Sequence, residues 1–233
     1  DPRGIWLGNR RYRGHLRVEL KSNRIIAVNY LGIERYLMSV VGSEMPKDWP
    51  IAALKAQAVA ARTYALKRLG SKEAYDINST ESSQVYLGLE SETSTTRAAV
   101  NRTRSLVLRY QGKLISALFH SSSGGKTEPS GSVWKYQLPY LNSVLDYDQH
   151  NPKVRWEKKI PPAELRKEFF DIGGLNSIRV LETSKTGRIL KAKVYGPRGH
   201  LSINGIELRR RLDLPSTLAK FEILPYNTPS MST

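Results

Sequence analysis

Residues 33–69 read IERYLMSVVGSEMPKDWPIAALKAQAVAARTYALKRL, and the two helices that we expect in this stretch set the fold. The apolar residues of the first half recur at the spacing of one helical face: Ile33, Leu37, Val40 and Val41. Glu44 falls on the same face, and Pro46 cannot continue a helix. The pattern therefore predicts a first helix whose buried stripe ends at a carboxyl group.

The second half predicts a longer helix from Pro50 to Leu69, because proline suits a first helical turn and Gly70 can cap the end. Its small residues are Ala52, Ala53, Ala56, Ala58, Ala60, Ala61 and Ala65. Since alanine leaves little side-chain bulk, we expect other elements to approach this helix closely, which makes it central. Gln57 and Arg62 are its notable polar exceptions.

Outside this stretch the chain alternates short strand and helix patterns. Hairpins are predicted at 14–30 and 105–119, strands within 178–194, and helices at 94–104, 163–170 and 206–212. Residues 129–162 are polar and proline-rich, which is typical of a long surface excursion. We expect an α+β fold, with mixed sheets and hairpins around the Ala-rich helix, and consider two lobes flanking a substrate cleft as a variant of it.

The composition narrows the classes of partner. The chain has 233 residues, 39% of them hydrophobic, and a formal net charge of +16, which favours a polyanionic partner such as nucleic acid, an anionic membrane surface or an anionic wall polymer. Cysteine is absent, so there is no disulfide or thiolate site. No apolar run is long enough to span a membrane. The start at Asp1 suggests a processed product whose targeting segment is not in this chain.

Glu44 is the first candidate for chemistry. A carboxyl group at the end of an apolar helical stripe should be partly desolvated, which raises its pKa toward the range that a general acid needs. The alternative is a structural glutamate paired with Arg62, and ion pairs of that kind are commoner than catalytic acids. The sequence leaves both open.

The loop HSSSGGKTE, residues 120–128, is the second candidate. As a metal site it offers His120 as a plausible ligand, but Lys126 cannot ligate while protonated and no cysteine is available. As a serine nucleophile it lacks the G-x-S-x-G elbow. A Gly-rich turn whose hydroxyls bond their own backbone is the plain alternative. In the segment QVYLG, Gln84 and Tyr86 would point to one side of a strand, where an amide and a phenol suit sugar hydroxyls; an ordinary edge strand explains them as well.

Several motifs taken together resemble the SpoIID/LytB family, the sporulation stage II protein D type of peptidoglycan enzyme. They are ERYLMSVVGSEMPKDWPIAALKAQAVAARTYAL, ESSQVYLG, FHSSSGGKTEPSGSVW, LPYLNSV, GRILKAKVYG and LRRRLDLPST. The match runs in order from about residue 13 to residue 221, so we expect a single SpoIID-like domain over 1–233 with 222–233 as a tail.

The resemblance implies a lytic transglycosylase that cleaves peptidoglycan glycan strands and leaves 1,6-anhydro-muramyl ends. Glu44 would be the single general acid and base, and Arg62 a supporting active-site residue. One carboxyl group suffices, because the sugar's own 6-hydroxyl replaces water as the nucleophile. The candidate substrate-binding residues are Gln57, Gln84, Tyr86, His120, Ser122, Ser123, Lys126 and Tyr140.

The loop departs from the family pattern at a zinc site. Some relatives resemble zinc proteins with one histidine and two cysteines in and after this loop, whereas here His120 is kept and Lys126 and Ser132 stand at the cysteine positions. We therefore expect no metal and no cofactor, with Gly124 and Gly125 and hydroxyl hydrogen bonds holding the loop.

Two rival functions are considered beside the enzyme. A non-catalytic cell-wall-binding module or amidase enhancer would bind wall material without new glycan ends. Nucleic-acid binding would use the positive charge, but no basic helix with interleaved aromatic residues is visible. We expect glycan strands and a wall amidase as partners, no nucleic acid, and an extracytoplasmic location in the periplasm, cell wall or medium.

Overall fold

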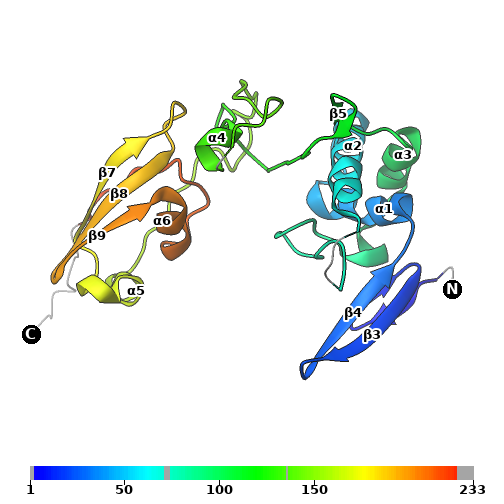
Figure 1. Cartoon of the computed structure of the whole chain (residues 1–233), viewed down its shortest axis with the longest axis horizontal. Helices are drawn as coiled ribbons and strands as arrows, with labels where there is room; N and C mark the ends of the chain where they lie inside the picture. The colour runs from blue at the N-terminus through cyan, green and yellow to red at the C-terminus, as the bar shows by residue number, and fades with distance from the viewer. Residues whose placement is uncertain (1–2, 71–73, 135, 225–233) are drawn as a thin grey trace, which may run out of the picture. The chain divides into compact units, whose positions relative to one another are not determined.

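The computed structural model describes residues 3–70, 74–134 and 136–224, and the chain divides into two compact units, Asp1–Phe119 and His120–Thr233. Figure 1 shows the order of the elements, and each unit is taken by itself below. Small antiparallel sheets and helices alternate along the chain, which confirms the α+β prediction. No helix of the described part is long and apolar enough to cross a membrane.

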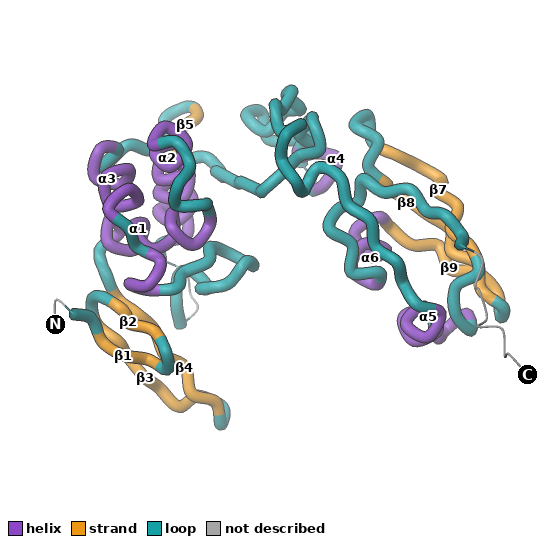
Figure 2. The backbone as a smooth tube through the Cα atoms, turned by 180° about the vertical axis from the view of Figure 1, so that it is seen from behind, coloured by secondary structure: helices purple, strands orange, loops and turns teal. Residues whose placement is uncertain are grey.

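The first unit joins hairpins to a cluster of three helices (Figure 2). Its strands are β1 Ile5–Leu7, β2 Arg10–Tyr12, β3 His15–Lys21, β4 Arg24–Tyr30, β5 Arg109–Tyr110 and β6 Lys113–Leu114. Its helices are α1 Ile33–Glu44, α2 Ile51–Arg68, α3 Ser94–Arg102 and the 3-10 turn η1 Gly88–Ser91. Both predicted helices of residues 33–69 are therefore confirmed to within one residue.

The helices pack through small and branched side chains. Leu37, Val40 and Val41 of α1 are fully buried, as are Ala58, Ala61 and Ala65 of α2. The alanines let α2 pack against both α1 and α3, so the Ala-rich helix is central to this unit. Burial of apolar area at roughly 25 cal/mol per Å² is what holds the cluster together.

Gly42 fixes how α1 meets the following segment. A Cβ atom at this position would lie 2.0 Å from the carbonyl oxygen of Ser91, so only glycine allows α1 and η1 to approach this closely. Next to it, the Ser39 and Ser91 hydroxyls share a buried hydrogen bond of 2.8 Å. The close contact fixes the last turn of α1 and hence the position of Glu44.

The β3–β4 hairpin has the predicted turn. Ser22 and Asn23 both have positive φ, +48° and +59°, as a two-residue type I′ turn requires. The second predicted hairpin is shorter than expected, since Gln111 and Gly112 form its turn but only two residues pair on each side. Residues 84–87 have no regular structure, so QVYLG does not form the edge strand that was one interpretation.

The second unit is built on one three-stranded antiparallel sheet, in the order β7-β8-β9. Its strands are β7 Ser177–Thr183, β8 Ile189–Gly196 and β9 Gly199–Asn204. Helix α6, Gly205–Arg211, packs against β8 and β9, and the Asn204 side chain caps it by accepting from the Glu207 amide at 2.8 Å. The predicted strands and basic helix are confirmed.

The polar segment 129–162 carries little regular structure. Its one helix in the described residues is α4, Ser130–Val133, and it leads into α5, Pro162–Glu168, and the 3-10 turn η2, Phe170–Ile172. The end of the predicted tail, 225–233, lies outside the described residues. A single domain over 1–233 stays a prediction.

Candidate active site

Glu44 is the last residue of α1, and the chain leaves the helix directly after it. Met45 is extended, with φ −132° and ψ 149°, as the residue before a proline prefers. The Glu44 side chain is half-buried, and its Oε1 accepts a hydrogen bond of 2.6 Å from the backbone N–H of Val85. One carboxyl oxygen is thus anchored.

The surroundings of Glu44 favour its neutral form. Burial raises the pKa of the Glu44 carboxyl above its ordinary value, the Val85 hydrogen bond lowers it, and the nearby Glu81 carboxylate raises it further. The negative end of the helix dipole acts in the same direction as burial. This confirms the raised pKa that the apolar stripe predicted. Glu81, in the ESSQ stretch, is a neighbour that the sequence analysis missed.

Arg62 does not neutralise Glu44. Its guanidinium is 1% exposed and forms a bidentate ion pair with Glu34 at the start of α1, with Nη2–Oε2 and Nε–Oε1 distances of 2.7 and 3.0 Å. It also donates to the carbonyl oxygens of Leu106 and Val100. The alternative of a structural Glu44–Arg62 pair is therefore wrong, and Glu44 has no ion pair among the described residues.

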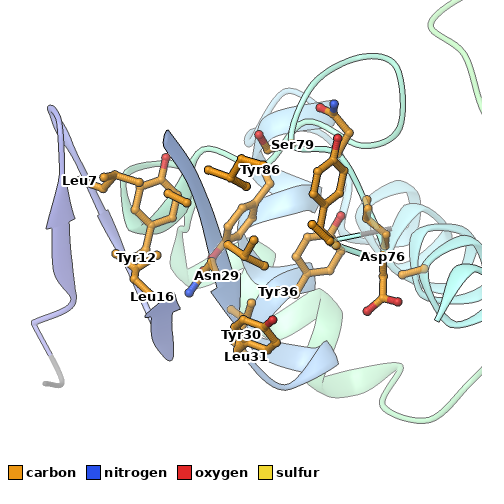
Figure 3. Close-up of a pocket in the computed structure, with 18 of the residues that line it drawn as sticks. Leu7, Tyr12, Leu16, Asn29, Tyr30, Leu31, Tyr36, Asp76, Ser79 and Tyr86 are labelled. Atoms are coloured by element: carbon orange, nitrogen blue, oxygen red, sulfur yellow. The ribbon is translucent and has the colours of Figure 1, made fainter. Parts of the chain in front are cut away.

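Gln84 and Tyr86 anchor the segment that holds Glu44. Gln84 is fully buried; its Oε1 accepts from the Tyr36 hydroxyl at 3.0 Å and its Nε2 donates to the Ala61 carbonyl at 3.2 Å. The Tyr86 hydroxyl donates to Asn29 Oδ1 at 2.7 Å. The Tyr86 ring packs beside the Tyr36 ring, with 5.1 Å between the ring centroids (Figure 3). These bonds fix the residues on both sides of Val85, whose backbone N–H binds Glu44. The hydrogen bonds of the Gln84 side chain are made inside the helical core.

Gln57 is half-buried on α2 and less constrained. Its Nε2 is buried and has no hydrogen-bond partner in the described part of the chain. A buried amide without a partner costs stability, so Gln57 is a position where a ligand or water would be favoured. Its role in substrate binding remains a prediction.

The HSSSGGKTE loop belongs to the second unit and is held by Asp148. One oxygen, Asp148 Oδ2, accepts from the Ser122 hydroxyl at 2.5 Å and from the backbone N–H groups of Ser123 and Gly124 at 2.8 and 3.0 Å. The Ser122 hydrogen bond is the largest cause of the lowered pKa of Asp148, followed among the lowering effects by the backbone N–H donors. Gly124 and Gly125 have φ of +75° and +98°, as expected for the turns of this loop.

The remaining loop candidates differ in exposure. His120 and Lys126 are exposed, Tyr140 is half-buried, and the Lys126 backbone forms an isolated β-bridge with Leu145. Because the Ser122 hydroxyl is bonded to Asp148 and the Ser123 side chain is buried, the exposed side chains are the more accessible for substrate. In the described ranges no three His, Asp or Glu side chains gather as a metal site would need. The metal-free loop remains a prediction.

Comparison with known proteins places these residues in a family. Residues 21–110 match the model of the SpoIID family, described as Stage II sporulation protein, and this range contains Glu44, Arg62, Gln57, Gln84 and Tyr86. The chain is also 40% identical over 198 residues to an uncharacterized protein of Brachyspira hyodysenteriae, a match that covers 82% of this chain and 54% of that protein.

Two named relatives come from Bacillus subtilis. The amidase enhancer is 39% identical over 136 residues, which is 58% of this chain and 18% of that protein. Stage II sporulation protein D is 30% identical over 215 residues, covering 84% of this chain and 61% of that protein. The chain thus spans between about a fifth and three fifths of these relatives' lengths. Residues 21–110 of the chain are therefore a SpoIID-family domain, and the similarity to stage II sporulation protein D extends over most of the chain.

Proposed function

We propose that this protein is a peptidoglycan lytic transglycosylase with Glu44 as its single general acid and base. The observation that carries the proposal is the state of Glu44: a half-buried carboxyl with a raised pKa, held through one oxygen by Val85 and without an ion pair among the described residues. A raised pKa increases the protonated fraction of the carboxyl group at any given pH, and protonation of a leaving group requires the protonated form.

The reaction uses the two protonation states of Glu44 in turn. The neutral acid donates its proton to the glycosidic oxygen while the bond from that oxygen to the muramyl C1 breaks. The resulting carboxylate then accepts the proton of the 6-hydroxyl as O6 bonds to C1. The 1,6-anhydro ring closes, Glu44 regains its proton, and no water is consumed.

Arg62 has a positioning role in this proposal. The Arg62–Glu34 pair links α2 to the first turn of α1, while Gly42 fixes the last turn against η1. Together they fix the helix that carries Glu44. Of the candidates in the second unit, the Lys126 ammonium suits the anionic groups of wall material.

A second function is favoured by one relative's name. The similarity to an amidase enhancer supports a wall-binding protein that stimulates a separate amidase, at an extracytoplasmic site. The two functions are separated by incubating purified glycan strands with the protein alone and with a wall amidase. The enzyme produces 1,6-anhydro ends without amidase, whereas an enhancer produces none and only accelerates release of stem peptides.

A further inference from the structure

The first unit contains a cavity of about 640 Å³ between the β3–β4 hairpin and the helices, within the size range of ligand pockets (Figure 3). Tyrosines are prominent in its lining: Tyr12, Tyr30, Tyr36, Tyr75 and Tyr86. Glu44 is not in the lining, but Tyr86 is the sequence neighbour of Val85, which holds Glu44. The cavity is therefore distinct from the candidate active site, and the two are connected through the adjacent residues Val85 and Tyr86.

Residues from both faces of strand β4 line the cavity. Residues 26–30 of β4 all line it in an unbroken run, although successive side chains of a strand point to opposite faces. Both faces can border one cavity around a free edge of the strand. Among the described residues β4 pairs with β3 alone, so its other edge has no strand beside it, and the lining residues indicate that this edge faces the cavity.

The register shows which backbone groups lie on that free edge. Lys21 and Arg24 close the two-residue turn, so they form a hydrogen-bonded pair, and the pairs of an antiparallel ladder then alternate. Ala27 opposite Val18, and Asn29 opposite Leu16, are consequently non-hydrogen-bonded pairs. The N–H and C=O groups of Ala27 and Asn29 point away from β3, and none of them has a backbone partner in the described ranges.

The tyrosines divide into a closed floor and an open rim. The hydroxyls of Tyr36 and Tyr86 are engaged by Gln84 and Asn29, and both rings are under 10% exposed. Tyr30 and Tyr75, by contrast, are 47% and 43% exposed. The cavity thus combines accessible aromatic faces with a row of backbone amide groups.

We propose that this cavity is an accessory subsite for an N-acetylhexosamine glycan, an inference that rests on the proposed action on wall glycan. An acetamido group is itself an amide, so its C=O and N–H complement the N–H and C=O of a free strand edge. The apolar face of a pyranose ring packs on an aromatic ring such as Tyr75. A glycan in this cavity would lie against Tyr86, the residue that follows Val85, and the Val85 backbone N–H binds Glu44.

The other ligand that suits a free strand edge is an extended peptide added as a further strand. The exposed tyrosines favour the sugar, because a peptide strand would use the edge without needing aromatic platforms. The peptide is therefore an outcome that the experiment must be able to show.

The test uses tetra-N-acetylchitotetraose as the probe and the Glu44→Gln protein, which binds without cleavage. The Asn29 backbone amide is followed by NMR, so that only this cavity is reported. Ala27→Pro removes one N–H from the free edge, and prolines are tolerated on edge strands. Val18→Pro is the matched control: Val18 is paired directly with Ala27, and its N–H points out of the opposite edge.

We expect the Asn29 signal to shift when the sugar is added. Ala27→Pro and Tyr75→Ala should each weaken sugar binding about tenfold, because each loses one good contact. Val18→Pro should bind the sugar as before. No shift with the sugar overturns the proposal, as does equal binding by Ala27→Pro and Val18→Pro. A shift with an acetylated alternating Val-Glu hexapeptide but not with sugar replaces glycan by peptide. Because every protein in this experiment carries Glu44→Gln, the experiment measures binding and not cleavage. An absence of sugar binding in the cavity would leave the proposed cleavage reaction standing, and sugar binding can be found even if the wild type cleaves no glycan.

Discussion

At the scale of single residues, Glu44 combines an unfavourable place for a charge with a fixed geometry. Burial and the neighbouring Glu81 carboxylate both raise its pKa, and only the Val85 amide opposes them. The positive charge that could have stabilised the ion, Arg62, is engaged by Glu34. Glu44 is thus destabilised as a carboxylate and available as an acid.

This state gives Glu44 a cost in stability that depends on pH. The pKa of Glu44 in the folded protein lies above its unfolded value, so folding stability falls as pH rises from the ordinary glutamate range through the raised pKa. Glu44→Gln removes the charge and keeps an acceptor for Val85. We expect its melting temperature to exceed that of the wild type at pH 7–8 and to equal it near pH 3. A wild type that is the more stable at pH 8 would contradict the raised pKa.

Glu81 should tune the acid. Replacing it in Glu81→Gln removes a like charge, which lowers the pKa of Glu44. Because the protonated form is the active acid, the alkaline limb of the pH–activity profile should move to lower pH, with little change at acidic pH. The profile of kcat/KM against pH measures this, and an unshifted alkaline limb would show that Glu81 does not act on Glu44.

The residue scale was only partly predictable. The helical spacing of residues 33–41 was enough to place Glu44 at the edge of the core, because the period of a helix fixes its face. The partner of Arg62 was not predictable, since Glu34 and Glu44 both lie on α1 and only the packing of α2 against it selects between them. Asp148 was missed because it follows the loop that it holds by 20 residues or more in sequence.

At the scale of elements, the Arg62–Glu34 pair joins α1 and α2. Loss of one partner leaves the other charge uncompensated, so we expect Arg62→Ala to destabilise the protein by about 3–5 kcal/mol, measured by urea unfolding. The double variant Arg62→Met with Glu34→Gln removes both charges and should recover part of that loss. If Arg62→Ala kept full stability yet lost activity, Arg62 would be catalytic rather than structural.

Element boundaries followed the sequence where local chemistry is strong. Pro46, the Ser22-Asn23 turn and the Asn204 cap each specify a boundary through their own backbone preferences. Residues 84–87 look like a strand by their alternating pattern, yet the side chains of Gln84 and Tyr86 are hydrogen-bonded to α1, α2 and β4. Tertiary contacts of this kind override a short local pattern.

At the scale of the whole molecule, the net charge of +16 should draw the protein to anionic wall material. Salt screens the attraction between exposed charges, over roughly 8 Å at physiological ionic strength, and the screening length shortens as salt rises. Binding to insoluble peptidoglycan should therefore weaken steadily as salt rises from about 50 to about 500 mM. Sedimentation of the protein with purified sacculi measures this. Retention that is independent of salt would mean that the charge is not what binds the wall.

The central claim is that Glu44 alone performs the cleavage. Purified glycan strands are digested with the wild type, with Glu44→Gln and with Glu81→Gln, and the products are analysed by mass spectrometry. The account predicts 1,6-anhydro-muramyl ends from the wild type and from Glu81→Gln, and none from Glu44→Gln. Identical undigested profiles for the wild type and Glu44→Gln would contradict it, and so would reducing ends in place of anhydro ends.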